Sequence, residues 1–245
     1  MHAADILVNM SNVYKAFGSN QVLKGLSLEL YRGENLVVLG KSGSGKSVLI
    51  KCLVRLINHD SGNIAVLNND VESLSERALD VLRTRIGFLF QGSALYDSMT
   101  VEENMGFAMN RLRKQVTGVA LTKLIDEALE NVGLKQTGKL MPSELSGGMK
   151  KRVALARTII MKPEIMLYDE PTTGLDPITS REISKLIVDL QSQYHMSSII
   201  ITHDIPCAKI TANRLMALVN GVNYATGSYD ELRTHQDILV KSFFE

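Results

Sequence analysis

The sequence has no tryptophan and only two cysteines, Cys52 and Cys207, among its 245 residues. Both cysteines lie in apolar surroundings and far apart in the chain. They therefore predict reduced thiols and a cytosolic compartment rather than a disulfide-linked secreted protein. The chain begins with no basic stretch followed by an apolar core, so no signal peptide is expected. No apolar run approaches the length of a membrane-spanning helix, so a role at a membrane would need another chain to do the spanning.

An excess of charge of either sign is also missing. The chain has 27 basic and 26 acidic residues, which give a net charge of +1. Its densest basic stretches, Lys150-Lys151-Arg152 and Arg111-Leu112-Arg113-Lys114, are short, so no nucleic-acid partner is expected. With 45% apolar residues, the chain can form one large α/β domain or one domain with an inserted subdomain.

The most informative stretch that is present is Gly40–Ser47, which reads GKSGSGKS and matches the phosphate-loop pattern G-x-x-x-x-G-K-[ST] at every position. An apolar run at 35–39 predicts a buried strand before it, and the apolar spacing of 48–57 predicts a helix after it. The positive end of that helix would face the phosphates. Three glycines leave the backbone N–H groups open to a triphosphate: Gly40, Gly43 and Gly45. Lys46 is expected to reach the β- and γ-phosphates, and the Ser47 hydroxyl to ligate Mg²⁺.

A second acidic feature follows the apolar strand predicted at 165–168, where Asp169 and Glu170 are adjacent. Buried carboxylates are costly without partners, and a cation beside the phosphate loop would supply one. Asp169 is therefore expected to act on Mg²⁺, directly or through water. Glu170 is expected to orient and deprotonate a water molecule.

The order of apolar patterns predicts an α/β core that a helical region interrupts. Strands are expected within 5–30 and at 62–67, 86–90, 165–168, 198–202 and 215–219, and core helices at 75–83 and 180–191. Longer helical patterns fill the insertion at 101–110, 121–132 and 147–160. The expected division is a core at 5–91 and 162–222, a helical subdomain at 92–161 and a C-terminal helical tail at 223–245.

Another helix start with bare backbone N–H groups reads Leu145-Ser146-Gly147-Gly148-Met149 and continues KKRVALAR. Ser146 is a good N-cap, and a capped helix start is an anion site. This motif resembles the LSGGQ signature of ATP-binding cassette proteins, and the resemblance extends over essentially the whole chain. Met149 is the departure, since glutamine is the commonest residue there. Activity is expected to survive this departure, because Ser146 and both glycines would supply the phosphate contacts.

The remaining motifs of that family occur in order. Phe17 matches the aromatic residue that stacks on adenine, with Tyr14 as the alternative. Gln91 matches the Q-loop glutamine, which touches Mg²⁺ and couples to the membrane partner. Asp176 lies in the D-loop match, and His203 matches the switch histidine on the γ-phosphate.

The resemblance implies a P-loop NTPase fold of the cassette type, with a RecA-like core, an antiparallel β subdomain and an inserted helical subdomain. It implies ATP and Mg²⁺ as cofactors, and Glu170, His203 and Gln91 as the residues of hydrolysis. The residues expected to contact ATP are Phe17, Gly40, Lys41, Ser42, Gly43, Ser44, Gly45, Lys46, Ser47, Ser146, Gly147, Gly148, Met149 and Asp176. Those expected to hold Mg²⁺ are Ser47, Gln91 and Asp169.

The resemblance also implies partners. Two copies of the chain would pair head to tail, with each ATP between Gly40–Ser47 of one copy and Ser146–Gly148 of the other. Hydrolysis would release this clamp and move a transmembrane permease. The stretch 88–101, FLFQGSALYDSMTV, resembles Mla-type ATPases, which energise bacterial phospholipid transport with an Mce-domain protein. The expected complex then adds that protein and, in some systems, a small regulatory subunit, at the cytoplasmic face of the bacterial inner membrane.

Several alternatives stay open at this point. They are a cassette ATPase for another solute, such as an amino acid or a metal, and a non-transport cassette protein acting on DNA or ribosomes. A phosphate-loop GTPase or kinase and a nucleotide-binding scaffold without turnover are the others. Met99, Met105 and Met109 suggest either an adaptable docking surface or ordinary core packing.

Overall fold

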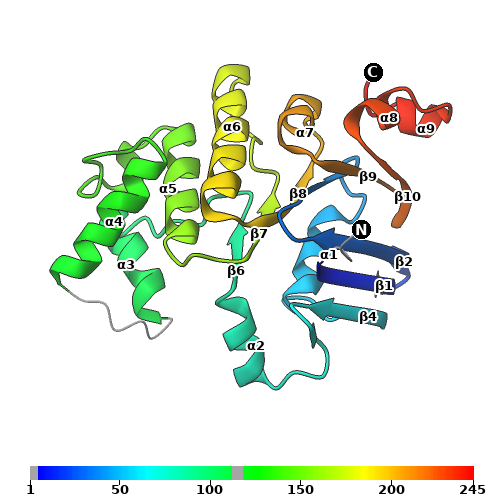
Figure 1. Ribbon diagram of the computed structural model, residues 1–245, viewed down its shortest axis with the longest axis horizontal. Coiled ribbons are helices and arrows are strands. Elements are labelled where there is room, and N and C mark those ends of the chain that lie inside the picture. Colours follow the sequence, from blue (N-terminus) through cyan, green and yellow to red (C-terminus); the bar gives the residue numbers. More distant parts are fainter. Residues whose placement is uncertain (1–4, 112–117) are drawn as a thin grey trace.

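The computed structural model describes residues 5–111 and 118–245, and a six-stranded sheet forms its centre (Figure 1). The strand order is β10-β9-β3-β8-β7-β6. These strands are β10 (Val222–Gly227), β9 (Arg214–Val219), β3 (Asn35–Leu39), β8 (Ser197–Thr202), β7 (Ile165–Asp169) and β6 (Ile86–Leu89). All neighbours pair in parallel except β10, which pairs antiparallel with β9. The strands β3, β7 and β8 are buried along their whole length, which explains their continuous apolar runs.

A second sheet is antiparallel and has the order β2-β1-β4-β5. Its strands are β1 (Ile6–Phe17), β2 (Asn20–Tyr31), β4 (Ser61–Val66) and β5 (Asn69–Asp70). On β2, the buried side chains Leu26, Leu28 and Leu30 alternate with more exposed residues. This alternation turns one face of the small sheet toward the core. The antiparallel β subdomain predicted from the resemblance is therefore present.

The two faces of the central sheet carry different helices. Val37, Leu39 and Tyr168 pack in one core cluster with α5 (Gly147–Ile159), α6 (Pro177–Tyr194) and α7 (Ile205–Thr211). Leu36 and Val38 point the other way, into a cluster that holds α1 (Lys46–Leu53) and the antiparallel sheet. Thus α1 and α5 cover opposite faces of the same sheet.

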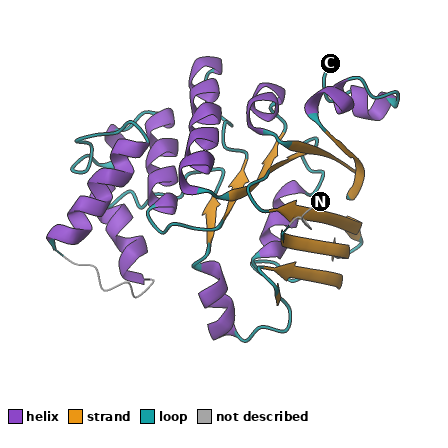
Figure 2. Ribbon diagram, viewed as in Figure 1, coloured by secondary structure: helices purple, strands orange, loops and turns teal. Residues whose placement is uncertain are grey.

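The insertion predicted at 92–161 is helical in its described part. It contains α3 (Val101–Arg111), α4 (Val119–Asn131), a short 3-10 turn (Pro142–Glu144) and α5. Figure 2 shows these helices at the end of the molecule away from the antiparallel strands. Met105 and Met109 are 0% and 1% exposed and belong to the core cluster. The docking-surface interpretation is therefore wrong for these two methionines, which pack in the core.

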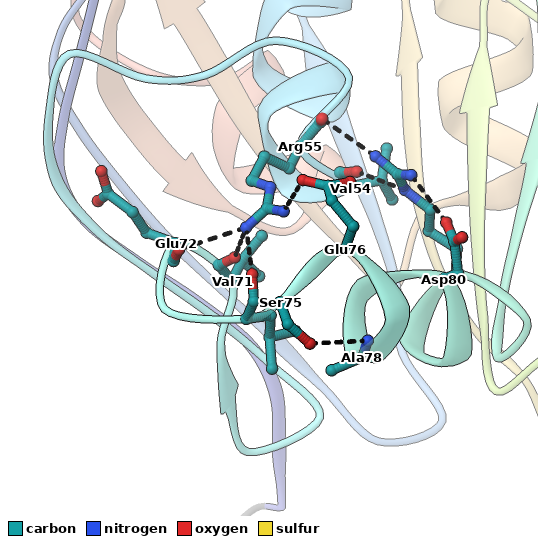
Figure 3. Close-up of polar contacts among 10 residues, drawn as sticks. Val54, Arg55, Val71, Glu72, Ser75, Glu76, Ala78 and Asp80 are labelled. Atoms are coloured by element: carbon teal, nitrogen blue, oxygen red, sulfur yellow. Dashed lines mark hydrogen bonds and ion pairs between the residues drawn. The ribbon is translucent and has the colours of Figure 1, made fainter.

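Two arginines fasten the end of α1 to the helix α2 (Glu76–Arg83), as Figure 3 shows. Arg55 has a left-handed backbone (φ 49°), which prevents α1 from continuing. Its guanidinium donates to the carbonyls of Val71 (3.1 Å), Glu72 (3.3 Å) and Leu74 (2.7 Å) and pairs with Glu76 (2.5 Å). Arg83 donates back to the carbonyls of Val54 and Arg55 at 3.0 and 3.1 Å. The helix that follows the phosphate loop is therefore anchored at its far end.

The C-terminal region contains the two helices expected there, α8 (Tyr229–Arg233) and α9 (Ile238–Lys241). The prediction of a helical tail from 223 onward is wrong for 223–227, which belong to β10. The division of the chain into core, insertion and tail stays a prediction otherwise. Over residues 5–111 and 118–245, no helix has the length and apolar character that crossing a membrane requires.

Candidate active site

The loop Gly40–Ser47 joins β3 to α1, as its pattern predicts. Gly43 and Gly45 have left-handed backbones (φ 80° and 98°) that side chains disfavour. A Cβ atom on Gly40 would lie 2.4 Å from Ser44 Oγ and 3.2 Å from carbons of the Lys46 side chain. The loop therefore encloses a space that even one methyl group would fill. A pocket of about 430 Å³ borders its residues Lys41–Ser44, the first three of which are exposed.

The side chain of Lys46 lies against the start of this loop, and the residue is 6% exposed. Its ammonium donates to the carbonyls of Gly40 (2.6 Å) and Lys41 (3.2 Å). It also lies 3.1 Å from Oε1 of Glu170. The Ser44 hydroxyl is buried and has no hydrogen-bond partner within the described part of the chain. Because a buried hydroxyl without a partner is unfavourable, the loop fits a ligand that supplies acceptor oxygens, as a phosphate does.

Ser47 connects the loop to the end of β7. Its hydroxyl donates to Oδ1 of Asp169 at 3.0 Å. Burial raises the pKa of the Asp169 carboxyl, and the hydrogen bond from Ser47 opposes that shift. A hydroxyl and a carboxylate are oxygen ligands of the kind Mg²⁺ prefers. The described residues hold no group of three or more acidic, histidine or cysteine side chains suited to a metal, so phosphate oxygens and water would complete its coordination.

Glu170 and His203 meet beside Lys46. His203 Nδ1 lies 2.8 Å from Oε2 of Glu170, and the backbone N–H of His203 donates to the same oxygen at 3.2 Å. Glu170 is 8% exposed and has a left-handed backbone (φ 50°), a strained conformation that is concentrated at functional sites. The His203 side chain is 61% exposed. One oxygen of Glu170 thus faces Lys46, and the other faces a histidine that is open to solvent.

The strand order explains why these residues converge. The strands β3, β8 and β7 are consecutive neighbours and run parallel, so their carboxyl ends lie at one edge of the sheet. The phosphate loop follows β3, Asp169 ends β7, and His203 follows β8. In open α/β sheets, ligands bind at this edge.

The second predicted anion site, Ser146–Met149, begins α5 elsewhere in the molecule. Ser146 caps the helix by accepting a hydrogen bond from the N–H of Met149 at 3.2 Å, and Ser146 and Gly147 are exposed. Figure 1 shows strands β6 and β7 between α5 and α1. Within 5–111 and 118–245, no hydrogen bond or ion pair joins Ser146–Met149 to Gly40–Ser47. One copy of the chain therefore leaves these two helix starts apart.

Comparison with known proteins shows the family of the chain. A family model described as ABC transporter matches residues 23–173. The chain belongs to the ABC transporter family. It is the ATP-binding subunit of such a transporter and an ATPase, and its fold is the ATP-binding cassette of the P-loop NTPase class.

Three similar proteins illustrate the range of this family. The Arabidopsis thaliana protein TRIGALACTOSYLDIACYLGLYCEROL 3, chloroplastic, is 36% identical over 98% of this chain and 74% of its own length. A methionine import ATP-binding protein MetN from Rhizobium johnstonii is 38% identical over 89% of this chain and 60% of its own length. A solved dimeric, post-hydrolysis state of the ATP-binding cassette MJ0796, bound to ADP and Pi, is 30% identical. It has a TM-score of 0.82 and matches 91% of this chain and 98% of its own.

The other residues predicted to contact ATP include Phe17, with Tyr14 as its alternative, and Asp176. Phe17 ends β1, is 50% exposed and has the Lys15 ammonium 5.3 Å from its ring centre. The hydroxyl of Tyr14, the alternative, lies 2.8 Å from where a Cβ on Gly25 would stand, so this ring packs against β2. Asp176 caps α6 by accepting hydrogen bonds from the N–H groups of Ile178 and Thr179, both at 3.0 Å. The roles of Phe17 and Asp176 toward ATP stay predictions.

Gln91 lies just after β6, the edge strand next to β7, and is exposed. Its carbonyl accepts a hydrogen bond from the ammonium of Lys151. Burial lowers the pKa of Lys151, and the nearby carboxylates Asp169 and Glu170 oppose that shift. Sequence reasoning missed Lys151 because it treated Lys150–Arg152 only as a short basic stretch. A lysine within the apolar pattern of α5 was the available signal.

Proposed function

We propose that this cassette powers phospholipid transport through a partner permease and an Mce-domain protein, with ATP hydrolysed between two copies of the chain. The observation that carries the catalytic part is the pairing of Glu170 with Lys46 on one oxygen and His203 on the other. This pairing gathers a cation, a carboxylate and an imidazole at the phosphate loop, which is what a phosphoryl-transfer site needs.

Each of these side chains has a distinct proposed task. The Lys46 ammonium, now bonded to loop carbonyls, would turn to the β- and γ-phosphates. The Glu170 carboxylate, freed from that ion pair, would accept a proton from the attacking water. His203, which is largely exposed, would donate a hydrogen bond to a γ-phosphate oxygen. Mg²⁺, when bound at Ser47, Asp169 and Gln91, would neutralise charge between the phosphates.

A second copy is needed to complete the site. Ser146–Met149 begins α5 with Ser146 and Gly147 exposed, yet it lies on the helix that covers the opposite sheet face from α1. A head-to-tail pair would bring one copy's α5 start to the other copy's phosphate loop. The solved MJ0796 cassette, which is dimeric, supports this arrangement.

The lipid substrate rests on two resemblances. The stretch 88–101 resembles Mla-type ATPases, and a relative named for trigalactosyldiacylglycerol, a lipid, matches 98% of the chain. Two aromatic contacts involve this stretch: Phe90 stacks on Phe88 (4.1 Å between centroids), and Tyr96 packs edge-on against Phe107 (5.0 Å). Phe90, Tyr96 and Phe107 are each at least 36% exposed, so they offer an apolar surface to a permease. We place the complex at the cytoplasmic face of a bacterial inner membrane.

The test is to isolate the chain with its partners from native membranes and to identify them by mass spectrometry. We expect a permease and an Mce-domain protein, a small regulatory subunit in some preparations, and ATP hydrolysis that phospholipid vesicles stimulate. Recovery of a solute-binding protein, with stimulation by a small solute, would contradict the lipid assignment. Methionine is the first solute to try, since a methionine import protein is 38% identical.

A further inference from the structure

The segment that follows β6 has an unusual backbone. Ser93 and Ala94 are consecutive and both left-handed, with φ of 62° and 49°. Side chains disfavour this conformation, which two successive residues adopt here. Short turns form within the segment, where the N–H of Ser93 donates to the carbonyl of Phe90 (3.0 Å) and that of Ala94 to Gly92 (2.7 Å). Such a backbone persists when surrounding groups hold it.

The holding groups come from α5. The Lys151 ammonium donates to the carbonyl of Gln91. The Arg157 guanidinium donates through Nη1 to the carbonyl of Ala94 (2.5 Å) and through Nη2 to that of Ser93 (2.9 Å). Lys151 is 4% exposed, so its charge is kept from solvent and depends on these contacts. Two cations of one helix thus bind three carbonyls of 91–94.

The next stretch has a separate anchor. Asn104 on α3, 1% exposed, accepts a hydrogen bond from the N–H of Tyr96 (2.8 Å) and donates to the carbonyls of Tyr96 (3.1 Å) and Met99 (3.0 Å). Thus 96–100 is tied to α3 and 91–94 to α5. Because the two anchors lie on different helices, these contacts link Gln91 to α5 and not to α3.

We propose that Lys151 and Arg157 are positioning residues that fix Gln91 relative to the start of α5. The helix carries the Ser146–Met149 motif at its beginning, with Ser146 and Gly147 exposed, and these two cations further along. A shift of α5 when its start meets ATP on the second copy would therefore move the backbone of Gln91 with it. The inference rests on the proposed function for the roles of Gln91 and Ser146–Met149. The α5 clamp, which is the set of hydrogen bonds from Lys151 and Arg157 to the carbonyls of 91–94, rests only on contacts within one chain.

The test uses the full chain and two measurements. Lys151→Met and Arg157→Met remove the donors while keeping comparable length. In the nucleotide-free protein, we expect amide hydrogen exchange in 91–94 to quicken about tenfold, because a charged hydrogen bond is lost. In ATP hydrolysis, we expect the Mg²⁺ concentration for half-maximal rate to rise about tenfold, with the KM for ATP at saturating Mg²⁺ changed less than about threefold.

Arg152→Met is the matched control. This arginine lies on the same helix but donates to the carbonyl of Val132 (2.9 Å) and pairs with Glu182 (2.9 Å). We expect it to change thermal stability while leaving exchange in 91–94 and the Mg²⁺ midpoint unchanged. Should Lys151→Met or Arg157→Met fail to fold, Lys151→Arg and Arg157→Lys keep the cation with altered reach. The Lys151→Arg change should retain the clamp, and Arg157→Lys, with one ammonium for two carbonyls, should loosen it.

Unchanged exchange in both clamp variants would overturn the proposal. So would equal effects in Arg152→Met, or faster exchange without a shift of the Mg²⁺ midpoint. Failure of the proposed function would look different, since the unaltered chain would then show no Mg²⁺-dependent hydrolysis while the exchange result still held.

Discussion

The helix starts at Gly40–Ser47 and at Ser146–Met149 are both glycine-rich, but their surroundings differ. The first is enclosed: Lys46 is 6% exposed, and Asp169 and Glu170 close around it at the carboxyl edge of the sheet. The second is open, with Ser146 and Gly147 exposed and the cap supplied by Ser146 alone. One is enclosed by charged side chains, and the other is an open surface.

The difference indicates that the two helix starts contribute differently to nucleotide binding and to turnover. A site whose charged groups already pair within one chain can bind nucleotide as a single copy. An exposed, capped helix start has N–H groups that satisfy nothing else, so it is suited to a ligand that a second molecule brings. Binding should therefore depend on the first region, and turnover on both.

The largest effect is expected from a substitution in the enclosed region. Glu170→Gln removes the carboxylate that faces both Lys46 and His203, and we expect hydrolysis to fall by about 10²–10⁴-fold, as loss of a general base does. ATP binding and ATP-dependent pairing should persist. Phosphate release is the measurement, and Asp189→Asn, an exposed carboxylate on α6, is the control. Full activity of Glu170→Gln would remove Glu170 from the mechanism.

The next effect contrasts thiols in the two regions. Burial raises the pKa of Cys52, on α1, to about 11. At pH 8 only about 0.1% of it is thiolate, against roughly a quarter for an exposed cysteine. A thiol introduced by Ser146→Cys should therefore react with iodoacetamide at least about 100-fold faster. Since a thiol ionises as pH rises, Cys52 labelling should increase about tenfold per pH unit up to pH 11, while labelling at 146 levels off near pH 9.

Cys207, whose pKa burial also raises to about 11, serves as the internal control for that labelling. Mass spectrometry of the separate peptides assigns each rate. Equal rates for Cys52 and the thiol at 146 would contradict the contrast between an enclosed and an open helix start.

Lys46→Ala should have a smaller effect, confined to binding. Removing one charged donor to phosphate costs about 1.5–3 kcal/mol, which weakens ATP affinity roughly 10- to 150-fold. Equilibrium titration with a fluorescent ATP analogue measures this, and Lys185→Ala, exposed on α6, is the comparison. Unaltered affinity would mean that Lys46 does not line the phosphate site.

Two glycine substitutions sharpen the comparison with the smallest effects. A Cβ at Gly40 would stand 2.4 Å from Ser44 Oγ, so Gly40→Ala should lower the ATP affinity of a single copy about tenfold. At Gly147 the nearest atom, on Leu175, is 3.4 Å away, which is an ordinary contact. Gly147→Ala should therefore change the ATP affinity by less than about twofold and the free energy of unfolding by less than about 0.5 kcal/mol. Turnover should slow about tenfold, because the added methyl group would obstruct the nucleotide bound to the second copy. If Gly147→Ala weakened ATP affinity and Gly40→Ala did not, the roles assigned to the two regions would be wrong.

The local motifs could be predicted from sequence because their chemistry depends on near neighbours. The phosphate loop needs glycines and a lysine at fixed spacing, and the strand–loop–helix context is visible in apolar runs. The pairing of Glu170 with His203 depends on β7 and β8 being neighbours, which became expected only through the family resemblance.

Other features depend on tertiary contacts that no local pattern reveals. Strand β10 exists because its partner β9 offers a free edge, and its own sequence, VNYATG, has a weak strand pattern. The burial of Met105 and Met109 follows from how α3 packs. The clamp of Lys151 and Arg157 joins residues about sixty positions apart, as the separations of 60 and 63 between donor and acceptor show.

The head-to-tail completion of the site is tested most directly by a protein that carries both Glu170→Gln and Ser146→Cys. With ATP and Mg²⁺, its mass in solution should become twice 27.0 kDa, and labelling of the thiol at 146 should stop as pairing occurs. With ADP, the mass should stay single and the thiol reactive. If the mass doubles while the thiol labels at its original rate, the two copies pair by another surface, and Ser146–Met149 does not complete the nucleotide site.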